Sequence, residues 1–135
     1  MSKSESIRSA ISLAEKVGHV FVATADAKGM PHVAAAAKIE RAQAGHVTLA
    51  AWFCPGTVLN LQQNRRIALV IWDRVEDIGY QLLGKVEKVE EMAMLDGYAP
   101  EVETAQPMPQ VERQLLVRVD KILSFTHAPH TDEEE

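Results

Sequence analysis

The sequence predicts a mainly β protein: a six-stranded antiparallel split β-barrel of Greek-key type, with two or three short helices. The chain has 135 residues, which suits a single domain. Segments rich in Val, Ile, Phe and Thr alternate with short turns of Gly, Asp and Asn, and such short links favour antiparallel pairing. Twisted antiparallel strands usually close into a barrel because closure removes exposed edges. A β-sandwich is the alternative.

The first half of the chain predicts one helix followed by strands. Apolar residues recur at helical spacing from Ile7 to Val17, and Gly18 follows as a stop signal. The composition then changes to that of a hairpin, whose turn contains Gly29, a residue free to adopt positive φ. The strands expected in this half are 19–25, 30–40 and 46–53.

The second half predicts a short helix from Thr57 to Asn64 and then three strands, 66–73, 78–89 and 112–125. Gly84 lies inside the second of these strands and indicates a β-bulge or a close backbone approach. Residues 90–98 could form a helix. Residues 99–110 contain three prolines and predict a loop. We expect one domain over residues 1–126 and an acidic, mobile tail over residues 127–135.

Composition argues against several classes of protein. The net charge is −5 and the only adjacent basic pair is Arg65-Arg66, which argues against nucleic-acid binding. Cys54 is the single cysteine, so an internal disulfide is excluded. No apolar run is long enough to span a bilayer, and the first residues lack the apolar core of a signal peptide. We therefore expect a cytoplasmic protein that binds neither membranes nor nucleic acid.

Three features could carry chemistry. Four consecutive alanines occupy positions 34–37, although alanine is a poor strand former. Their small side chains either let a flat ring approach the backbone or are required by a crowded barrel interior or subunit contact. Gly56 and Thr57 lead into a helix, whose N-terminus can bind an anion, although Thr57 could simply cap the helix. Gln81 offers both donors and acceptors to a polar ring edge, or it is an ordinary exposed residue.

The histidines are a weak signal. His127 and His130 flank a proline close to the acidic end of the chain, and no set of three or four convergent metal ligands is visible, so no metal site is expected. His19, His32 and His46 all lie at strand starts and are interpreted as surface residues. No catalytic triad or nucleotide-binding motif is present, and the catalytic residues stay unknown.

Three stretches, 24–33, 57–70 and 79–87, resemble in order and spacing the FMN-binding split-barrel family of pyridoxamine 5′-phosphate oxidase-like proteins. The most specific of them is the middle one, in which Asn60-Leu61 and then Asn64-Arg65-Arg66 precede an apolar strand. The resemblance implies an FMN cofactor at the interface of a homodimer. The resemblance implies that the ring or ribityl chain is lined by Ala35, Ala36, Ala37 and Lys38 and faced by Ala51 and Trp52. It implies that the phosphate is bound by Gly56 and Thr57 and that the loop is ordered by Asn60. It also implies a polar contact from Gln81 of the other subunit.

Gly56 departs from the family pattern, because relatives commonly carry a basic residue at this position. A charge-assisted hydrogen bond contributes roughly 1.5–3 kcal/mol, so its loss lowers FMN affinity by about one to two powers of ten. Thr57, backbone N–H groups and Arg65 or Arg66 would have to compensate.

The resemblance implies a flavoprotein that acts as an oxidoreductase or electron-transfer protein, with an unknown redox partner or small-molecule substrate. Flavin chemistry belongs to the cofactor, which explains the lack of an evident acid–base residue. The alternative is a protein that binds flavin without turnover, or one that keeps the fold and binds haem or a deazaflavin instead. His127 and His130 are then the candidate haem ligands.

Overall fold

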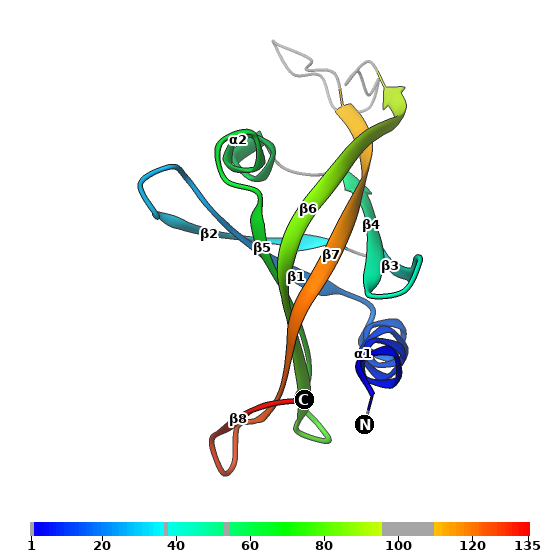
Figure 1. Ribbon diagram of the computed structural model, residues 1–135, viewed down its shortest axis with the longest axis vertical. Helices are drawn as coiled ribbons and strands as arrows, with labels where there is room; N and C mark the ends of the chain where they lie inside the picture. The colour runs from blue at the N-terminus through cyan, green and yellow to red at the C-terminus, as the bar shows by residue number, and fades with distance from the viewer. Residues whose placement is uncertain (1, 37, 53–54, 96–109) are drawn as a thin grey trace, which may run out of the picture.

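The computed structural model describes residues 2–36, 38–52, 55–95 and 110–135; for residues 51–52, 92–95 and 110–112 it describes the backbone alone. Two helices and eight strands make up these residues (Figure 1). The elements are α1 (Lys3–Val17), β1 (Val20–Ala25), β2 (Pro31–Ala36), β3 (Lys38–Arg41), β4 (His46–Trp52), α2 (Pro55–Gln63), β5 (Arg66–Asp73), β6 (Ile78–Leu95), β7 (Gln110–Thr126) and β8 (Thr131–Glu134).

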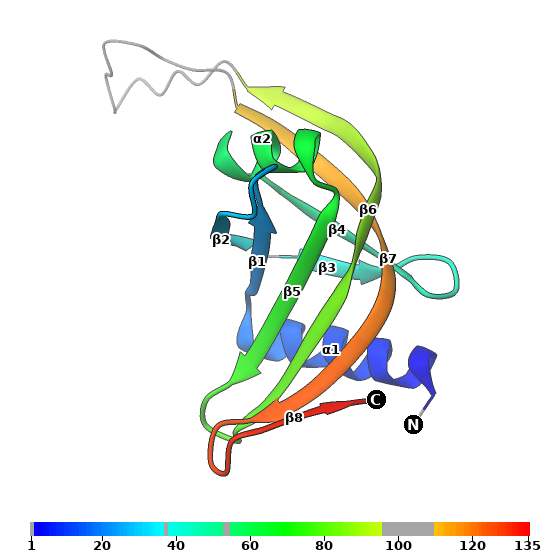
Figure 2. The same cartoon turned by 60° about the vertical axis from the view of Figure 1, so that its left-hand side comes forward.

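The strands form one antiparallel sheet whose two edges are neighbours in sequence. The hydrogen-bonded order is β2-β1-β5-β6-β7-β4-β3, with β8 paired to β7. Only residue 37 separates β2 from β3, and three consecutive Cα atoms span little more than 7 Å. The sheet must therefore curl until its edges meet, and β2 does contact β4. Figure 2 shows this curl, which confirms the predicted split barrel.

The number of strands differs from the prediction for two reasons. The strand expected over residues 30–40 is divided, because β2 pairs with β1 whereas β3 pairs with β4 at the other edge. The expected mobile tail over 127–135 instead contributes β8, in which Thr131–Glu134 pair with residues 123–126 of β7. The backbone hydrogen bonds of this pairing order a segment that has almost no apolar residues.

The helix expected over residues 90–98 is wrong for the part that the structure describes. β6 continues as a strand to Leu95, because β7 is long enough to pair with it as far as Gln110. Residues 96–98 and most of the expected loop lie outside the described residues. The helix expected over 57–64 is present as α2 but begins two residues earlier, at Pro55, since proline suits the first helical position.

Helix α1 matches the prediction and covers the core. The Ser2 side chain accepts from Glu5 N–H at its start, and Gly18 ends it with φ 85°. Its apolar face, which includes Ile7, Ala10 and Ile11, is buried against the sheet. Lys16 Nζ lies 3.0 Å from the buried carboxylate of Asp73 on β5. Both chain ends lie at the end of the molecule that carries β8 (Figure 1).

The sheet has a buried inner face and an outer face. On β5, Ile67, Leu69 and Ile71 are buried, whereas the alternate residues point outward. Gly84 marks a register shift on β6, and a Cβ there would overlap the carbonyl oxygen of Arg118, which confirms the close approach predicted for it. No helix among the described residues has the length and apolar character needed to cross a bilayer.

Candidate cofactor site

The first turn of α2 lies against β2. A Cβ atom added at Gly56 would come within 2.8 Å of His32 Nε2, so a larger residue at position 56 would displace the imidazole. The other ring nitrogen, Nδ1 of His32, is buried and has no hydrogen-bond partner in the part of the chain that the structure describes. Glycine therefore lets the imidazole pack directly against the helix start, and this imidazole has a buried nitrogen without a hydrogen-bond partner among the described residues.

Two side chains of α2 hold this helix in place. Asn60 Nδ2 donates to Thr24 Oγ1 on β1 at 3.1 Å. Gln63 Oε1 accepts from the backbone N–H of Ala27, in the β1–β2 turn, at 3.3 Å. Both bonds join α2 to the same hairpin that carries His32. The Asn60 amide thus links the helix to β1, and its ordering of the loop stays a prediction.

Thr57 is fully enclosed: its exposed fraction is 0 %. Its side chain therefore presents no surface to a phosphate outside the protein in this conformation. The anion-binding capacity of this helix start rests on backbone N–H groups and on the helix dipole. No Lys or Arg lies within α2 itself.

The alanine run divides between the two faces of β2. Ala35 is exposed on the outer face, whereas Ala36 belongs to the core and is only 6 % exposed. Lys38 begins β3 opposite Ala50, and its ammonium group lies 2.9 Å from Glu40 Oε1. Only Ala35 offers its side chain as part of an open shelf. Ala37 lies outside the described residues.

Ala51 and Trp52 form the last two positions of β4, and two residues separate Trp52 from Pro55, where α2 begins. The structure describes their backbone only. This backbone places them close to Lys38, because Lys38 pairs with Ala50. The predicted ring residues of β3 and β4 therefore lie on neighbouring strands at the β3 edge, whereas α2 packs mainly against β1 and β2.

Gln81 lies apart from this group within one chain. Register pairs connect Gln81 to Val70, Val70 to Phe21, and Phe21 to Ala35. These four residues share the outer face, and three strand spacings, or about 14 Å along the sheet, separate the first from the last. Within one chain, Gln81 therefore lies well away from Ala35.

Gln81 lines a pocket of about 560 Å³ together with two histidines that follow β7. The His127 and His130 rings lie edge to face with centroids 4.8 Å apart, and Trp72 lies 6.1 Å from His127. The Asp77 carboxylate accepts from the backbone N–H groups of His127 and Ala128 at 2.8 and 2.9 Å. These bonds lower the pKa of Asp77, and the Trp72 indole adds a third.

These residues fit a flavin mononucleotide in part. Ala35 and His32 lie on opposite faces of β2, because Ala35 pairs with the exposed Phe21 and His32 pairs with the buried Thr24. The unpartnered His32 nitrogen and Gly56 are therefore on the inner side of β2, whereas Ala35 offers a small surface on the outer side. His32 was interpreted as a surface residue from the sequence, and nothing in its neighbours indicates its contact with α2. Among the described residues, no three His, Cys, Asp or Glu side chains are grouped as metal ligands.

The comparisons with known proteins agree with this fold. The profile of the family described as Pyridoxamine 5′-phosphate oxidase matches residues 9–122. The chain therefore belongs to the pyridoxamine 5′-phosphate oxidase family. No curated protein matches it.

Solved structures share the fold at low sequence identity. A Clostridium acetobutylicum protein related to general stress protein 26 is 17 % identical, with a TM-score of 0.63 over 99 % of this chain and 96 % of its own. An FMN binding protein from Nostoc punctiforme is 10 % identical, with a TM-score of 0.65 over 98 % and 90 %. HutZ, the heme storage protein from Vibrio cholerae, is 14 % identical, with a TM-score of 0.52 over 90 % and 94 %.

Proposed function

We propose that this chain is a homodimeric flavoprotein that binds FMN between its subunits and transfers electrons through it. The observation that supports this most directly is the arrangement around Gly56: a helix start without a side chain, beside the unpartnered His32 nitrogen. FMN binding by the similar Nostoc punctiforme protein adds support. A cytoplasmic location remains a prediction from the sequence.

The outer face of the sheet supports dimerisation. Phe21 is 41 % exposed and Val33 64 %, and both lie on the same face as Val70 and Gln81. Apolar side chains on one contiguous sheet face are stabilised when a second surface covers them. A second copy is the partner that also carries Gln81 to the Ala35 edge of the first.

Each residue then has a limited task. The first turn of α2 would hold the phosphate, with backbone N–H groups as donors. Ala35 and the backbone of β2 would support the ring, and Gln81 of the second copy would bond its polar edge. The isoalloxazine ring, when bound, supplies the electron chemistry. The protein contributes binding, orientation and exclusion of water.

Visible absorption of the purified protein tests this function. We expect a flavin spectrum to persist after FMN is added and the excess is removed by gel filtration, at about one FMN per chain. His32→Ala should release FMN more readily than wild type. Gln43→Ala, which changes an exposed residue in the turn between β3 and β4, should not. A folded dimer that retains no flavin would contradict the proposal.

A second candidate function is haem binding, which the paired imidazoles of His127 and His130 favour. Imidazole nitrogen is a common axial ligand of haem iron, and the similar HutZ stores heme. Titration with haemin should then produce a Soret band that His127→Ala or His130→Ala removes. An unchanged spectrum in both variants would exclude these residues as ligands.

A further inference from the structure

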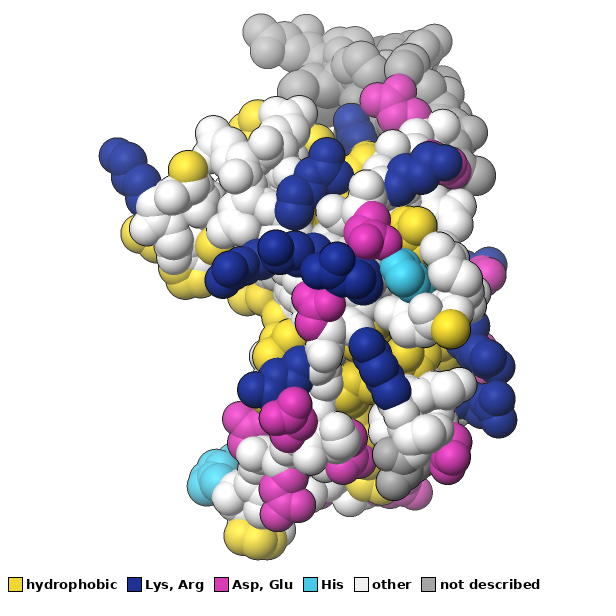
Figure 3. Space-filling view, in the orientation of Figure 1, with side chains coloured by type: hydrophobic (Ala, Val, Ile, Leu, Met, Phe, Trp, Pro, Cys, Tyr) yellow, Lys and Arg dark blue, Asp and Glu magenta, His cyan; other side chains and the backbone are white. Residues whose placement is uncertain are grey.

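Basic residues form a continuous row across four strands of the outer face. Arg66 on β5 pairs with Lys85 on β6, Lys85 pairs with Arg118 on β7, and Arg118 pairs with His46 on β4. Side chains at directly paired positions point to the same side of a sheet. Figure 3 shows a dark-blue band crossing this face and ending beside a histidine. We call these four residues the basic row.

The two ends of the basic row differ in how their charges are compensated. Arg118 Nε lies 2.8 Å from Asp120, and Glu87 lies within ion-pair distance of both Arg118 and His46. Arg66 and Lys85 form no ion pair within the described part of the chain. Like charges directly opposite each other destabilise a sheet. An anion bound at this pair would remove that repulsion.

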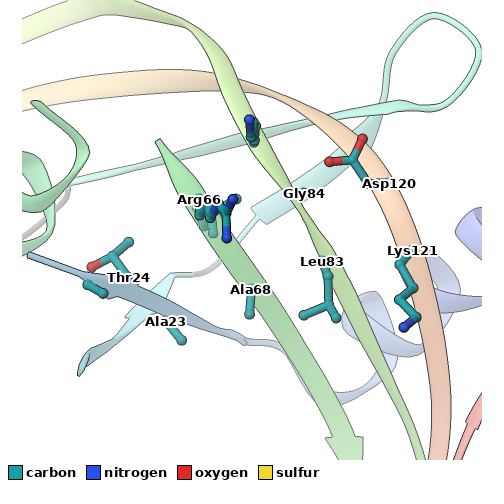
Figure 4. A pocket seen from close by; sticks show the side chains of 11 residues that line it. Ala23, Thr24, Arg66, Ala68, Leu83, Gly84, Asp120 and Lys121 are labelled. Carbon is teal, nitrogen blue, oxygen red and sulfur yellow. The ribbon is translucent and has the colours of Figure 1, made fainter. Parts of the chain in front are cut away.

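A groove of about 530 Å³ lies beside Arg66 and Lys85. Ala23, Ala68 and Leu83 form an apolar floor, since they occupy the next outward positions of β1, β5 and β6. Figure 4 shows Arg66, Asp120 and Lys121 around this floor. Asp120 is the one carboxylate among the lining residues; it forms an ion pair with Arg118 and also attracts Lys85, whose charge it compensates in part. The groove thus joins a flat apolar surface to a cationic rim.

We propose that this groove binds a small organic phosphate, with the phosphate at Arg66 and Lys85 and an apolar ring on the alanine and leucine floor. Guanidinium and ammonium groups both bind phosphate well, and small side chains admit a flat ring. The site is separate from the Gly56 region, and it adjoins the proposed subunit contact, because Ala23 of its floor pairs with Val33. The phosphate belongs either to a separate ligand or to FMN. In the second case the flavin phosphate lies at Arg66 and Lys85 and not at the first turn of α2, so that this part of the proposed function would fail.

Calorimetric titration of the full chain at low salt tests the groove. The probes are adenosine 5′-monophosphate, which combines a ring with a phosphate, and adenosine, which lacks the phosphate. We expect saturable binding of the monophosphate and at least tenfold weaker binding of adenosine. Arg66→Gln and Lys85→Gln should each weaken monophosphate binding about tenfold. Lys28→Gln, a matched loss of charge in the β1–β2 turn, should leave it unchanged.

Competition with FMN assigns the source of the phosphate. If FMN displaces the monophosphate in wild type but binds Arg66→Gln weakly, the groove holds the flavin phosphate. If both bind together, it holds a separate ligand. Absence of saturable binding by a protein that is folded by circular dichroism, or equal weakening by Lys28→Gln, overturns the proposal. The titrations use protein from which bound flavin has been removed, so that retained FMN cannot occupy the groove.

Discussion

At the scale of single residues, His46 is held by two acceptors at once. Its Nδ1 lies 2.9 Å from the Ala44 carbonyl oxygen and its Nε2 lies 2.6 Å from Glu87 Oε1. Only the protonated imidazole donates to both. The Ala44 carbonyl, and next the Glu87 carboxylate, therefore raise the pKa of His46 above its ordinary 6.5, whereas burial and Arg118 oppose them.

This shift predicts a loss of stability as pH rises. Because the folded-state pKa of His46 exceeds the unfolded one, its contribution is fully present below pH 6.5 and disappears as pH rises through the folded-state pKa. The urea midpoint of wild type should therefore fall between about pH 6 and about pH 9 by more than that of His46→Gln. His19→Gln, which changes a histidine outside this cluster, should follow wild type. Parallel pH profiles for wild type and His46→Gln would contradict the assignment.

At the scale of elements, Asp77 connects the β5–β6 turn to the turn before β8. Asp77 has φ 54°, a conformation that Asn also tolerates, so Asp77→Asn removes the charge with little backbone strain. Its pKa is lowered mainly by the His127 and Ala128 N–H groups. We expect Asp77→Asn to speed amide hydrogen exchange in β8 while α1 and β5 keep wild-type protection.

The same contact weakens in acid. Because the folded-state pKa of Asp77 is depressed, its contribution is present above the ordinary value of 3.8 and is lost as pH falls through the folded-state pKa. Glu133→Gln changes a carboxylate on β8 itself and serves as the control. Equal exchange rates for β8 in Asp77→Asn and Glu133→Gln would show that Asp77 does not hold this strand.

At the scale of the whole molecule, the exposed apolar face predicts the oligomeric state. Val33→Asp places a charge in the proposed subunit contact, on a side chain exposed enough for the single chain still to fold. We expect the mass measured by light scattering to fall from that of two chains to that of one, 14.9 kDa. Bound FMN should be lost at the same time. Val75→Asp alters an equally apolar residue, 89 % exposed in the β5–β6 turn, and should remain dimeric. A wild-type protein that is monomeric at micromolar concentration would contradict the shared site.

The sequence by itself determined which segments are strands and helices over most of the chain, and their order. The alternation of β5, the stop at Gly18 and the bulge at Gly84 are local patterns, because they depend on backbone conformation and on side chains two to four residues apart. Local patterns predicted the wrong secondary structure where strand pairing decided it. β6 continues past residue 90 and β8 forms from an acidic segment, because both pair with β7.

Only the tertiary structure decided which residues of distant segments lie next to one another. The contact of Gly56 with His32, the burial of Ala36 and Thr57, and the alignment of Arg66, Lys85, Arg118 and His46 all depend on register between strands that are distant in sequence. A shift of one residue in any of these pairings would turn a side chain to the opposite face. Register is set by the packing of the whole core, so neither the groove nor its charge could be found from the sequence alone.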